Sequence, residues 1–220
     1  MTDATQDTSG TKQKRPRTES KEVRRRQLID ATIDSISKHG ISGTTMTTVT
    51  GAAGLSIGLV NFHFKTKGIL FEETLRFLAE EHRDRWKRSY DKADLAPEAK
   101  LLAIADAHYH PKICNRKKLS VWFGFYGEAT YRARYRDIMQ QIDPERWTLS
   151  RGLCAQIVAD GGYDHVDPKA VADTLEGLYD GFSLNILIYP GQFSREDAKA
   201  RIRAYLATTF PKHFDFPTRS

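Results

Sequence analysis

Residues 44–67 read TTMTTVTGAAGLSIGLVNFHFKTK, and the order of caps, turn and apolar positions in this stretch decides the fold. The hydroxyls of Thr44 and Thr45 can accept hydrogen bonds from the free amides of a helix N-terminus, so a short helix is expected to begin there and to end at Gly54. Ser56 is a second N-cap just beyond it. Two short helices separated by a three-residue turn that contains glycine predict a helix-turn-helix.

The second of these helices is expected to have one buried and one exposed side. Leu55 before the cap and Val60 after it stand in hydrophobic-staple positions. Val60 and Phe64 lie one turn apart and should face the core. The outer side is small and polar, so Gly58 would let the backbone approach a base edge, while Asn61 could donate a hydrogen bond in the major groove.

Helical patterns continue on both sides of this stretch. From Ser20 to His39-Gly40, one face of a predicted helix carries Leu28, Ile29, Thr32, Ile33 and Ile36. After the stretch, Thr66 caps a predicted helix of about 25 residues, whose inner face carries Phe71, Leu75, Leu78, His82 and Trp86.

The rest of the chain also predicts helices, because no alternating run bounded by turn dipeptides occurs in it. The predicted helices span residues 97–108, 116–130, 135–159, 168–188 and 195–209. We therefore expect an all-α protein of about nine helices, with a three-helix head and a larger helical bundle. The predicted divisions are a disordered basic arm at 1–18, a helix-turn-helix DNA-binding domain at 19–66, a helical ligand-binding and dimerisation domain at 67–214, and a tail at 215–220.

Positive charge is concentrated near the N-terminus. The chain has 34 Lys and Arg against 28 Asp and Glu, a net charge of +6 with neutral His. Residues 1–67 hold 11 basic residues against 6 acidic ones, and residues 68–220 hold 23 against 22. A small basic module beside a nearly neutral body is typical of a protein whose head faces a polyanion, and helix N-termini attract phosphate oxygens. Double-stranded DNA is the expected partner of the head, although a solvated basic tail without a partner would give the same distribution of charge.

Several classes of protein are excluded. The longest apolar stretches, Val121 to Tyr126 and Phe182 to Tyr189, are far shorter than the roughly 18 to 20 residues of a membrane span. Cys114 and Cys154 form no CxxC pair, which argues against a disulfide framework or a zinc ribbon. We expect a protein of the reducing cytoplasm that does not bind membranes.

Residues 23–78, with 44–67 at their centre, resemble the DNA-binding head of TetR-family repressors. The resemblance lies in the Gly-apolar-Ser turn, the aromatic-His-Phe ending and the Lys that follows. It implies a ligand-responsive transcriptional repressor of the bacterial cytosol, associated with the nucleoid, which binds a pseudo-palindromic operator as a homodimer and is released by a small molecule. Helices 168–188 and 195–209 would then join their twins in the dimer, although they could also simply close the core of the monomer.

The same resemblance implies a set of DNA-contacting residues. Base proximity is implied for Ile57 and Gly58. Phosphate contacts are implied for Thr45, Thr47, Ser56, Asn61, Phe62, His63 and Lys67. Two positions depart from the family pattern, since Asn61 stands where Tyr is most frequent and Thr50 where a small Ala is usual.

The body resembles that of the BetI-like branch, which is associated with choline and glycine betaine. The resemblance rests on Leu119-Ser120-Val121-Trp122-Phe123-Gly124-Phe125-Tyr126-Gly127-Glu128, and more weakly on Ser150-Arg151-Gly152-Leu153 and Gly177-Leu178-Tyr179-Asp180-Gly181. Trp122 and Tyr126, one turn apart, could cage a quaternary ammonium effector such as choline, and each desolvated ring would contribute about 2 kcal/mol by cation–π attraction. Glu128, Tyr179 and Asp180 could complete the pocket. An aromatic stripe at helical spacing is also an ordinary core feature.

Two alternatives belong to other functional classes. One is a helical scaffold whose basic arm binds an acidic protein or membrane surface. The other is a metal-binding enzyme built on His108, His110 and Cys114, but the two histidines point to nearly opposite sides of a helix. The sequence has no GxSxG, Gly-rich phosphate loop or HExxH. We therefore expect no enzymatic activity, no metal and no cofactor.

Overall fold

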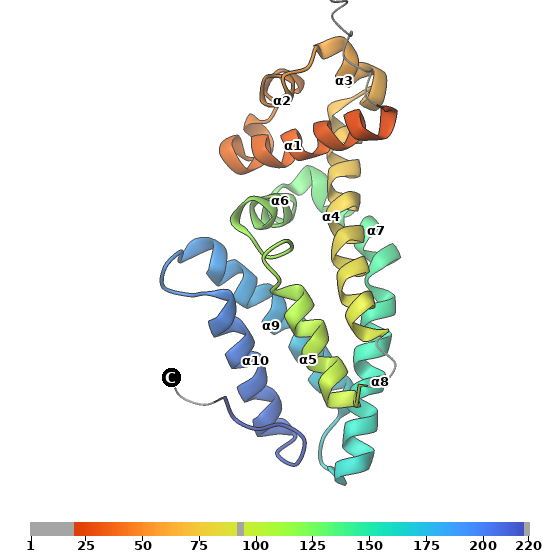
Figure 1. Ribbon diagram of the computed structural model, residues 1–220, viewed down its shortest axis with the longest axis vertical. Helices are drawn as coiled ribbons and strands as arrows, with labels where there is room; N and C mark the ends of the chain where they lie inside the picture. The colour runs from red at the N-terminus through yellow and green to blue at the C-terminus, as the bar shows by residue number, and fades with distance from the viewer. Residues whose placement is uncertain (1–19, 92–94, 218–220) are drawn as a thin grey trace, which may run out of the picture.

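The structure is a computed structural model that describes residues 20–91 and 95–217; the arm predicted at residues 1–18 lies outside them. This described part of the chain forms ten helices and no strand (Figure 1). The helices are α1 (Lys21–Gly43), α2 (Met46–Ala53), α3 (Ile57–Phe64), α4 (Lys67–Tyr90), α5 (Pro97–His108), α6 (Arg116–Gly127), α7 (Ala129–Ile142), α8 (Pro144–Gly161), α9 (Pro168–Ile188) and α10 (Arg195–Thr209). The prediction of an all-α fold with a helix-turn-helix head and a larger helical body is confirmed.

Side-chain caps fix where the helices of the head begin. Ser20, Ser56 and Thr66 each accept a hydrogen bond from the third amide of the helix that follows. Thr45 does the same in a reciprocal capping box at the start of α2. Gly54 has a φ of 65°, a left-handed conformation that glycine adopts without steric cost, and it turns the chain from α2 into α3.

The body has one helix more than predicted. Residues 116–130 and 135–159 were expected to form two helices, whereas the structure divides this region into α6, α7 and α8. Glu128 is extended (φ −86°, ψ 114°) and separates α6 from α7. Pro144 separates α7 from α8, because it has no N–H to donate into α7 and its ring favours the first turn of a new helix.

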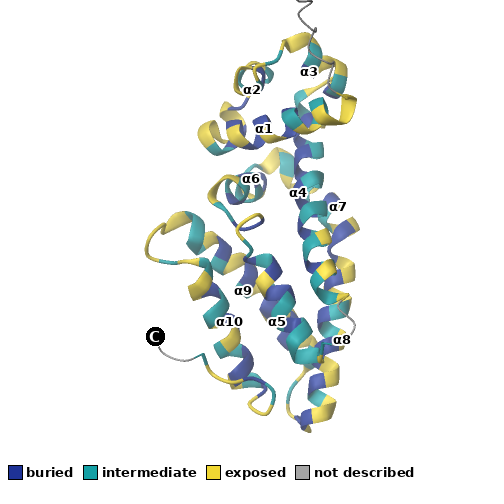
Figure 2. Cartoon of the chain, viewed as in Figure 1, coloured by how far each residue is buried: buried dark blue, intermediate teal, exposed yellow. Residues whose placement is uncertain are grey.

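Two apolar cores hold the molecule together. One core joins α1 to α4 with one side of α6 and α7, which contribute Val121, Phe125, Ile138 and Ile142. The other lies among α5, α8, α9 and α10. Figure 2 shows the buried faces of these helices turned toward each other. The three-helix head therefore shares its core with three helices of the body, α4, α6 and α7.

Helix α6 crosses the end of α1 at very short range (Figure 1). A Cβ atom at Gly124 would lie 2.9 Å from Cγ1 of Ile41, closer than real Cβ atoms come to other heavy atoms. Polar contacts flank the crossing: the Lys117 ammonium lies 2.6 Å from an oxygen of Asp34, and the Ser42 hydroxyl donates to Glu128. This crossing is a direct contact between head and body.

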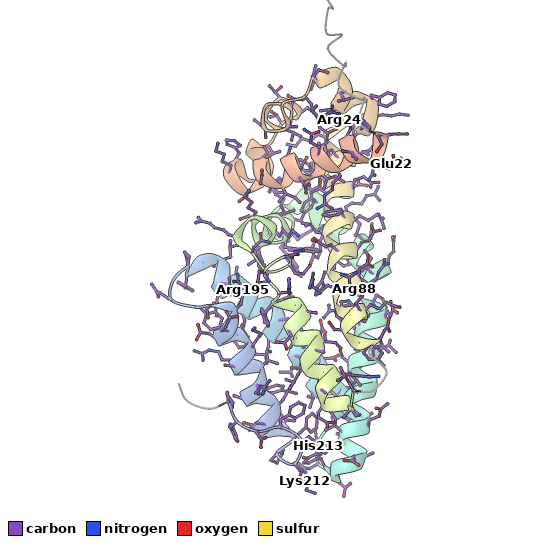
Figure 3. The ribbon with its side chains drawn as sticks, in the orientation of Figure 1. Glu22, Arg24, Arg88, Arg195, Lys212 and His213 are labelled. Carbon is purple, nitrogen blue, oxygen red and sulfur yellow. The ribbon has the colours of Figure 1, made fainter. Side chains whose placement is uncertain are left out.

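The end of the chain is fastened to α8, far from the head. Figure 3 places Lys212 and His213 at the opposite end of the molecule from Arg24. The two ring nitrogens of His213 lie 3.1 Å from the Tyr163 hydroxyl and 2.9 Å from an oxygen of Asp160, and the Lys212 ammonium donates to the carbonyl of Gly161 at 2.5 Å. Of the tail predicted at 215–220, residues 215–217 are irregular and 218–220 lie outside the described part.

We expect Gly124→Val to lower the free energy of unfolding by about 1–3 kcal/mol, because the added side chain overpacks the contact with Ile41. Urea unfolding followed by circular dichroism measures the change. Gly127→Val is the matched control, since a Cβ at Gly127 meets no heavy atom within 4 Å. Equal losses in the two variants would contradict close packing at Gly124.

Candidate nucleic-acid interface and interior cavity

Helix α3 presents a clear division between a buried and an exposed side. Val60 and Phe64 are buried in the head core, as predicted. Phe62 and Ile57 are 70% and 48% exposed, which is unusual for large apolar side chains. The other exposed residues predicted to contact DNA are Thr45, Thr47, Ser56, Gly58 and Asn61. Seven of the nine predicted contacts therefore lie on the surface of α2 and α3.

The hydroxyls that cap α2 and α3 still have a hydrogen-bond donor available. Thr45 and Ser56 accept from the amides of Thr48 and Leu59, at 3.1 and 3.3 Å. A hydroxyl that accepts one bond still carries its own proton, so each can donate to a phosphate oxygen. Thr50, where a small residue is usual in the family that the sequence resembles, satisfies its hydroxyl by donating to the Thr47 carbonyl at 2.8 Å.

The two basic residues of the predicted set are less exposed. The Lys67 ammonium donates to the carbonyl of Ile41 at 3.4 Å and lies 5.0 Å from the centre of the Phe71 ring. His63 is half-buried, with its ring against Phe62. Burial and then the positive charges of Lys21 and Arg25 lower the pKa of His63, which favours a neutral ring.

The body contains a cavity of about 830 Å³ bordered by α4 to α9. Of the predicted pocket residues, Trp122, Tyr126 and Asp180 line it and Glu128 and Tyr179 do not. Glu128 lies at the end of α6, where it accepts a hydrogen bond from Ser42.

Tyr179 belongs to the neighbouring core instead. Its ring stacks on His108 with the centres 4.9 Å apart, and it is 2% exposed. The sequence prediction was wrong for Tyr179 because successive residues of a helix point about 100° apart, so that Asp180 reaches the cavity and Tyr179 the core.

Aromatic rings and one carboxylate form a box on one side of the cavity. The rings of Tyr126 and Tyr135 lie 4.4 Å apart, and Trp122 packs edge-on against Tyr135 at 6.0 Å. The Tyr126 hydroxyl donates to Asp180 at 3.4 Å. We call Trp122, Tyr126, Tyr135 and Asp180 the aromatic box. Tyr135 and Trp147, which also lines the cavity, were not predicted from the sequence.

A buried ionic cluster forms another part of the cavity wall. The Arg146 guanidinium is 7% exposed and pairs with Glu176 and, at 3.3 Å, with Asp143. Burial alone would lower the pKa of Arg146, but the two carboxylates outweigh it and the pKa rises. Burial raises the pKa of both carboxyl groups. Because Arg146 itself is buried, removing one carboxylate partner would leave part of its charge uncompensated.

Two histidines complete the wall. The rings of His82 and His108 meet edge to face, 5.1 Å apart, and Nε2 of His108 lies 3.1 Å from the Ser183 hydroxyl. Burial is the main cause that lowers the pKa of both rings, to about 3 for His108, and the Arg146 charge acts in the same direction. Within the described residues, one ring nitrogen of each has no hydrogen-bond partner.

The suggested metal site does not assemble. His108 faces the cavity, while Nδ1 of His110 accepts from the amide of Lys112 at 3.1 Å. Residues 20–91 and 95–217 contain no group of three His, Cys, Asp or Glu placed to hold a metal ion. In the same residues, no helix is both long and apolar enough to cross a membrane.

Comparisons with known proteins match both parts of the chain. Residues 28–74 match the family described as bacterial regulatory proteins, tetR family, and residues 97–211 match the C-terminal region of BetI-type transcriptional repressors. The chain is 31% identical over 191 residues to the HTH-type transcriptional regulator BetI of Burkholderia thailandensis, a match that covers 86% of this chain and 92% of the relative. The BetI of Paraburkholderia phytofirmans is also 31% identical, over 195 residues, with the same coverage.

Solved structures share the fold at lower identity. A transcriptional regulator from Pseudomonas aeruginosa PAO1 has a TM-score of 0.75 and 22% identity, covering 90% of this chain and 97% of its own. A regulator from Saccharomonospora viridis, solved in complex with choline, has a TM-score of 0.71 and 16% identity, covering 84% and 96%.

The low pKa values of His82 and His108 predict acid sensitivity. Below pH 6.5 the unfolded chain takes up protons that the folded chain does not, so stability is lost as the pH falls below about 6.5. For His108 the loss continues toward pH 3, at roughly 1 kcal/mol per pH unit, and His82 acts in the same direction. Unfolding free energies measured at pH 7, 6 and 5 should therefore fall less steeply in His108→Gln than in the unchanged chain. The exposed His39→Gln is the control, and a slope unaltered by His108→Gln would contradict the argument.

Proposed function

Because the chain belongs to the TetR family of bacterial regulatory proteins and carries a BetI-type repressor C-terminal region, we propose that it binds a pseudo-palindromic operator as a homodimer and leaves it when a small cation enters the cavity. Its family makes it a DNA-binding transcriptional regulator and not an enzyme. We place it in the bacterial cytoplasm. The observation that carries the proposal is the position of α6, which lines the cavity with Trp122 and Tyr126 and packs on α1 through Gly124.

We assign operator contact to the exposed side of α2 and α3. Gly58 has no side chain to hold the backbone away from a base edge, and Asn61 can donate and accept in the major groove. Ile57 and Phe62 offer apolar contact to bases and sugars. Thr45, Thr47, Ser56, His63 and Lys67 fix the position of the head on the phosphates. This division separates contacts that read sequence from contacts that give general affinity.

We assign the dimer interface to α9 and α10. Leu184, Ile188 and Tyr189 are 37%, 52% and 50% exposed near the end of α9, a density of apolar surface that water disfavours. Phe182 and Phe193 are partly buried beside them. A second copy of the chain on this face would bury these side chains and present two heads to the successive half-sites of a palindrome.

We assign the effector site to the aromatic box. The faces of aromatic rings attract a cation, and a quaternary ammonium suits them because it cannot donate hydrogen bonds to water. Asp180 supplies negative charge at the same place, and Tyr126 holds it by a hydrogen bond. The choline bound to the S. viridis regulator supports this class of ligand. Choline or a close relative is therefore the proposed effector.

Helix α6 then couples the two sites. Trp122 and Tyr126 line the cavity, and Val121, Gly124 and Phe125 pack with the head, where Trp122 also touches the same core. A ligand that repositions the first pair must move the second set, because the contact at Gly124 leaves no gap to absorb the shift. A typical coupling free energy of 1–3 kcal/mol would weaken operator binding about 5- to 150-fold.

The DNA assignment predicts different effects for two variants. Lys67→Glu should weaken binding to the selected operator and to an unrelated duplex by the same factor, whereas Asn61→Ala should weaken the operator more, by about 5- to 150-fold for a loss of 1–3 kcal/mol. Fluorescence anisotropy with an operator selected from a random duplex pool measures both, and its titration should end at two chains per operator.

Arg88→Glu, at an exposed position near the end of α4 in the body, controls for the change in net charge. A specific loss of operator binding in Lys67→Glu would contradict the phosphate role. If the unchanged chain bound no DNA duplex at low ionic strength, the proposal that it binds DNA would be overturned.

The effector assignment predicts that choline or betaine aldehyde gives a binding isotherm in titration calorimetry. Tyr126→Leu should weaken the binding of these ligands about 2- to 5-fold, because Tyr126 is 40% exposed and an exposed ring contributes about 0.5–1 kcal/mol. Asp173→Asn, an exposed carboxylate of the same helix as Asp180 and outside the cavity, should leave it unchanged. Flat traces with both ligands would overturn the proposed effector while leaving DNA binding untouched.

A further inference from the structure

Two arginines line the cavity on the side of α7. Arg132 and Arg136 are one turn apart, so they project from the same face of the helix, and both are exposed. Arg134, between them, points elsewhere and pairs with Glu72 of α4 at 2.8 Å. Among the described residues, neither Arg132 nor Arg136 has an ion-pair partner. The cavity thus carries two positive charges that the protein does not neutralise.

The opposite charge lies elsewhere on the cavity wall. Arg146 forms ion pairs with Asp143 and Glu176 and none with Asp180, so the described ion pairs leave Asp180 without a cation. Asp180 is held by a hydrogen bond from neutral Tyr126 and has no ion-pair partner in the described part of the chain. Positive charge on α7 and negative charge at the aromatic box make the cavity dipolar.

The volume also exceeds what a simple quaternary ammonium fills. A molecule of the size of choline occupies roughly 200 Å³ if each non-hydrogen atom takes about 30 Å³, the share of a water molecule in the liquid. The cavity offers about 830 Å³. A ligand with its ammonium in the aromatic box can therefore carry a further polar group that extends along α7.

We infer that the natural effector is a soluble zwitterion, in which a quaternary ammonium occupies the aromatic box and an anionic group binds Arg132 and Arg136. The inference rests on the proposed function and narrows its ligand class. Two guanidinium groups can bind the oxygens of a phosphate, sulfate or carboxylate through several charge-assisted hydrogen bonds. Cation–π attraction and Asp180 act on the other end of the ligand. Each charge of the ligand meets the opposite charge of the cavity.

Calorimetry with choline and phosphocholine measures the contribution of the anionic group to binding, because the two probes share the same quaternary ammonium. The full chain is expected to bind phosphocholine about 10- to 100-fold more tightly than choline. The double variant Arg132→Gln/Arg136→Gln is expected to lose that preference and to keep the affinity for choline. Arg134→Gln is the matched control from the same helix and should keep the preference. Vesicles of phosphatidylcholine should give no binding.

Three outcomes would overturn the inference. If the unchanged chain bound choline as tightly as phosphocholine or more tightly, the anionic group would have no role. The proposed quaternary ammonium class of effector would still stand. An equal loss for both probes in the double variant would assign Arg132 and Arg136 a structural role. Binding to the vesicles without binding to free phosphocholine would point to a lipid headgroup. Failure of both free probes and of the vesicles would instead overturn the quaternary ammonium proposal itself.

Discussion

The close contact of α6 with the end of α1 is the constraint on which the rest of the structure depends. Gly124 lets the two helices approach until no side-chain atom fits between the backbone of α6 and Ile41. Proteins are packed too densely for such a contact to change gradually. A shift of α6 must therefore move α1 with it, or α1 must hold α6 in place. Because the opposite face of α6 carries Trp122 and Tyr126, the same helix belongs to the cavity and to the head. The cavity and the DNA-binding head share one rigid element.

The cavity explains why the body keeps so many polar groups inside. Burying Arg146 with two carboxylates gives little net stability, since the desolvation of three charges offsets their attraction. His82 and His108 remain neutral for the same reason. Replacing such buried ion pairs by well-packed apolar side chains is often neutral or stabilising. Such a replacement would present no charge to a ligand and no means to discriminate among ligands.

Local rules predicted the head and only part of the body. Ser56, Gly54 and Thr66 signal their caps and turn within a few residues, so the helix-turn-helix could be predicted from sequence alone. The break at Pro144 was equally local and was overlooked. The residues that line the cavity come from several helices, so local patterns identified only some of them. Trp122 and Tyr126 were predicted from their spacing on one helix, while Tyr135 and Trp147 come from other helices. Periodicity shows that a side chain faces inward, but not which helix it meets there.

The arginines of α7 illustrate this limit. In the sequence, Arg132, Arg134 and Arg136 alternate within one short segment and look equivalent. The helix turns Arg134 toward Glu72 and the other two arginines toward the cavity. The rotation of about 100° per residue therefore separates a surface ion pair from two charges without an ion-pair partner, among the described residues, beside the cavity. A surface ion pair contributes little to stability, whereas a charge without a partner at a cavity wall is available to a ligand. The break at Glu128 sets the angle from which α7 starts, so this break, which the sequence predicted a few residues later at 131–134, also determines which of these arginines reach the cavity.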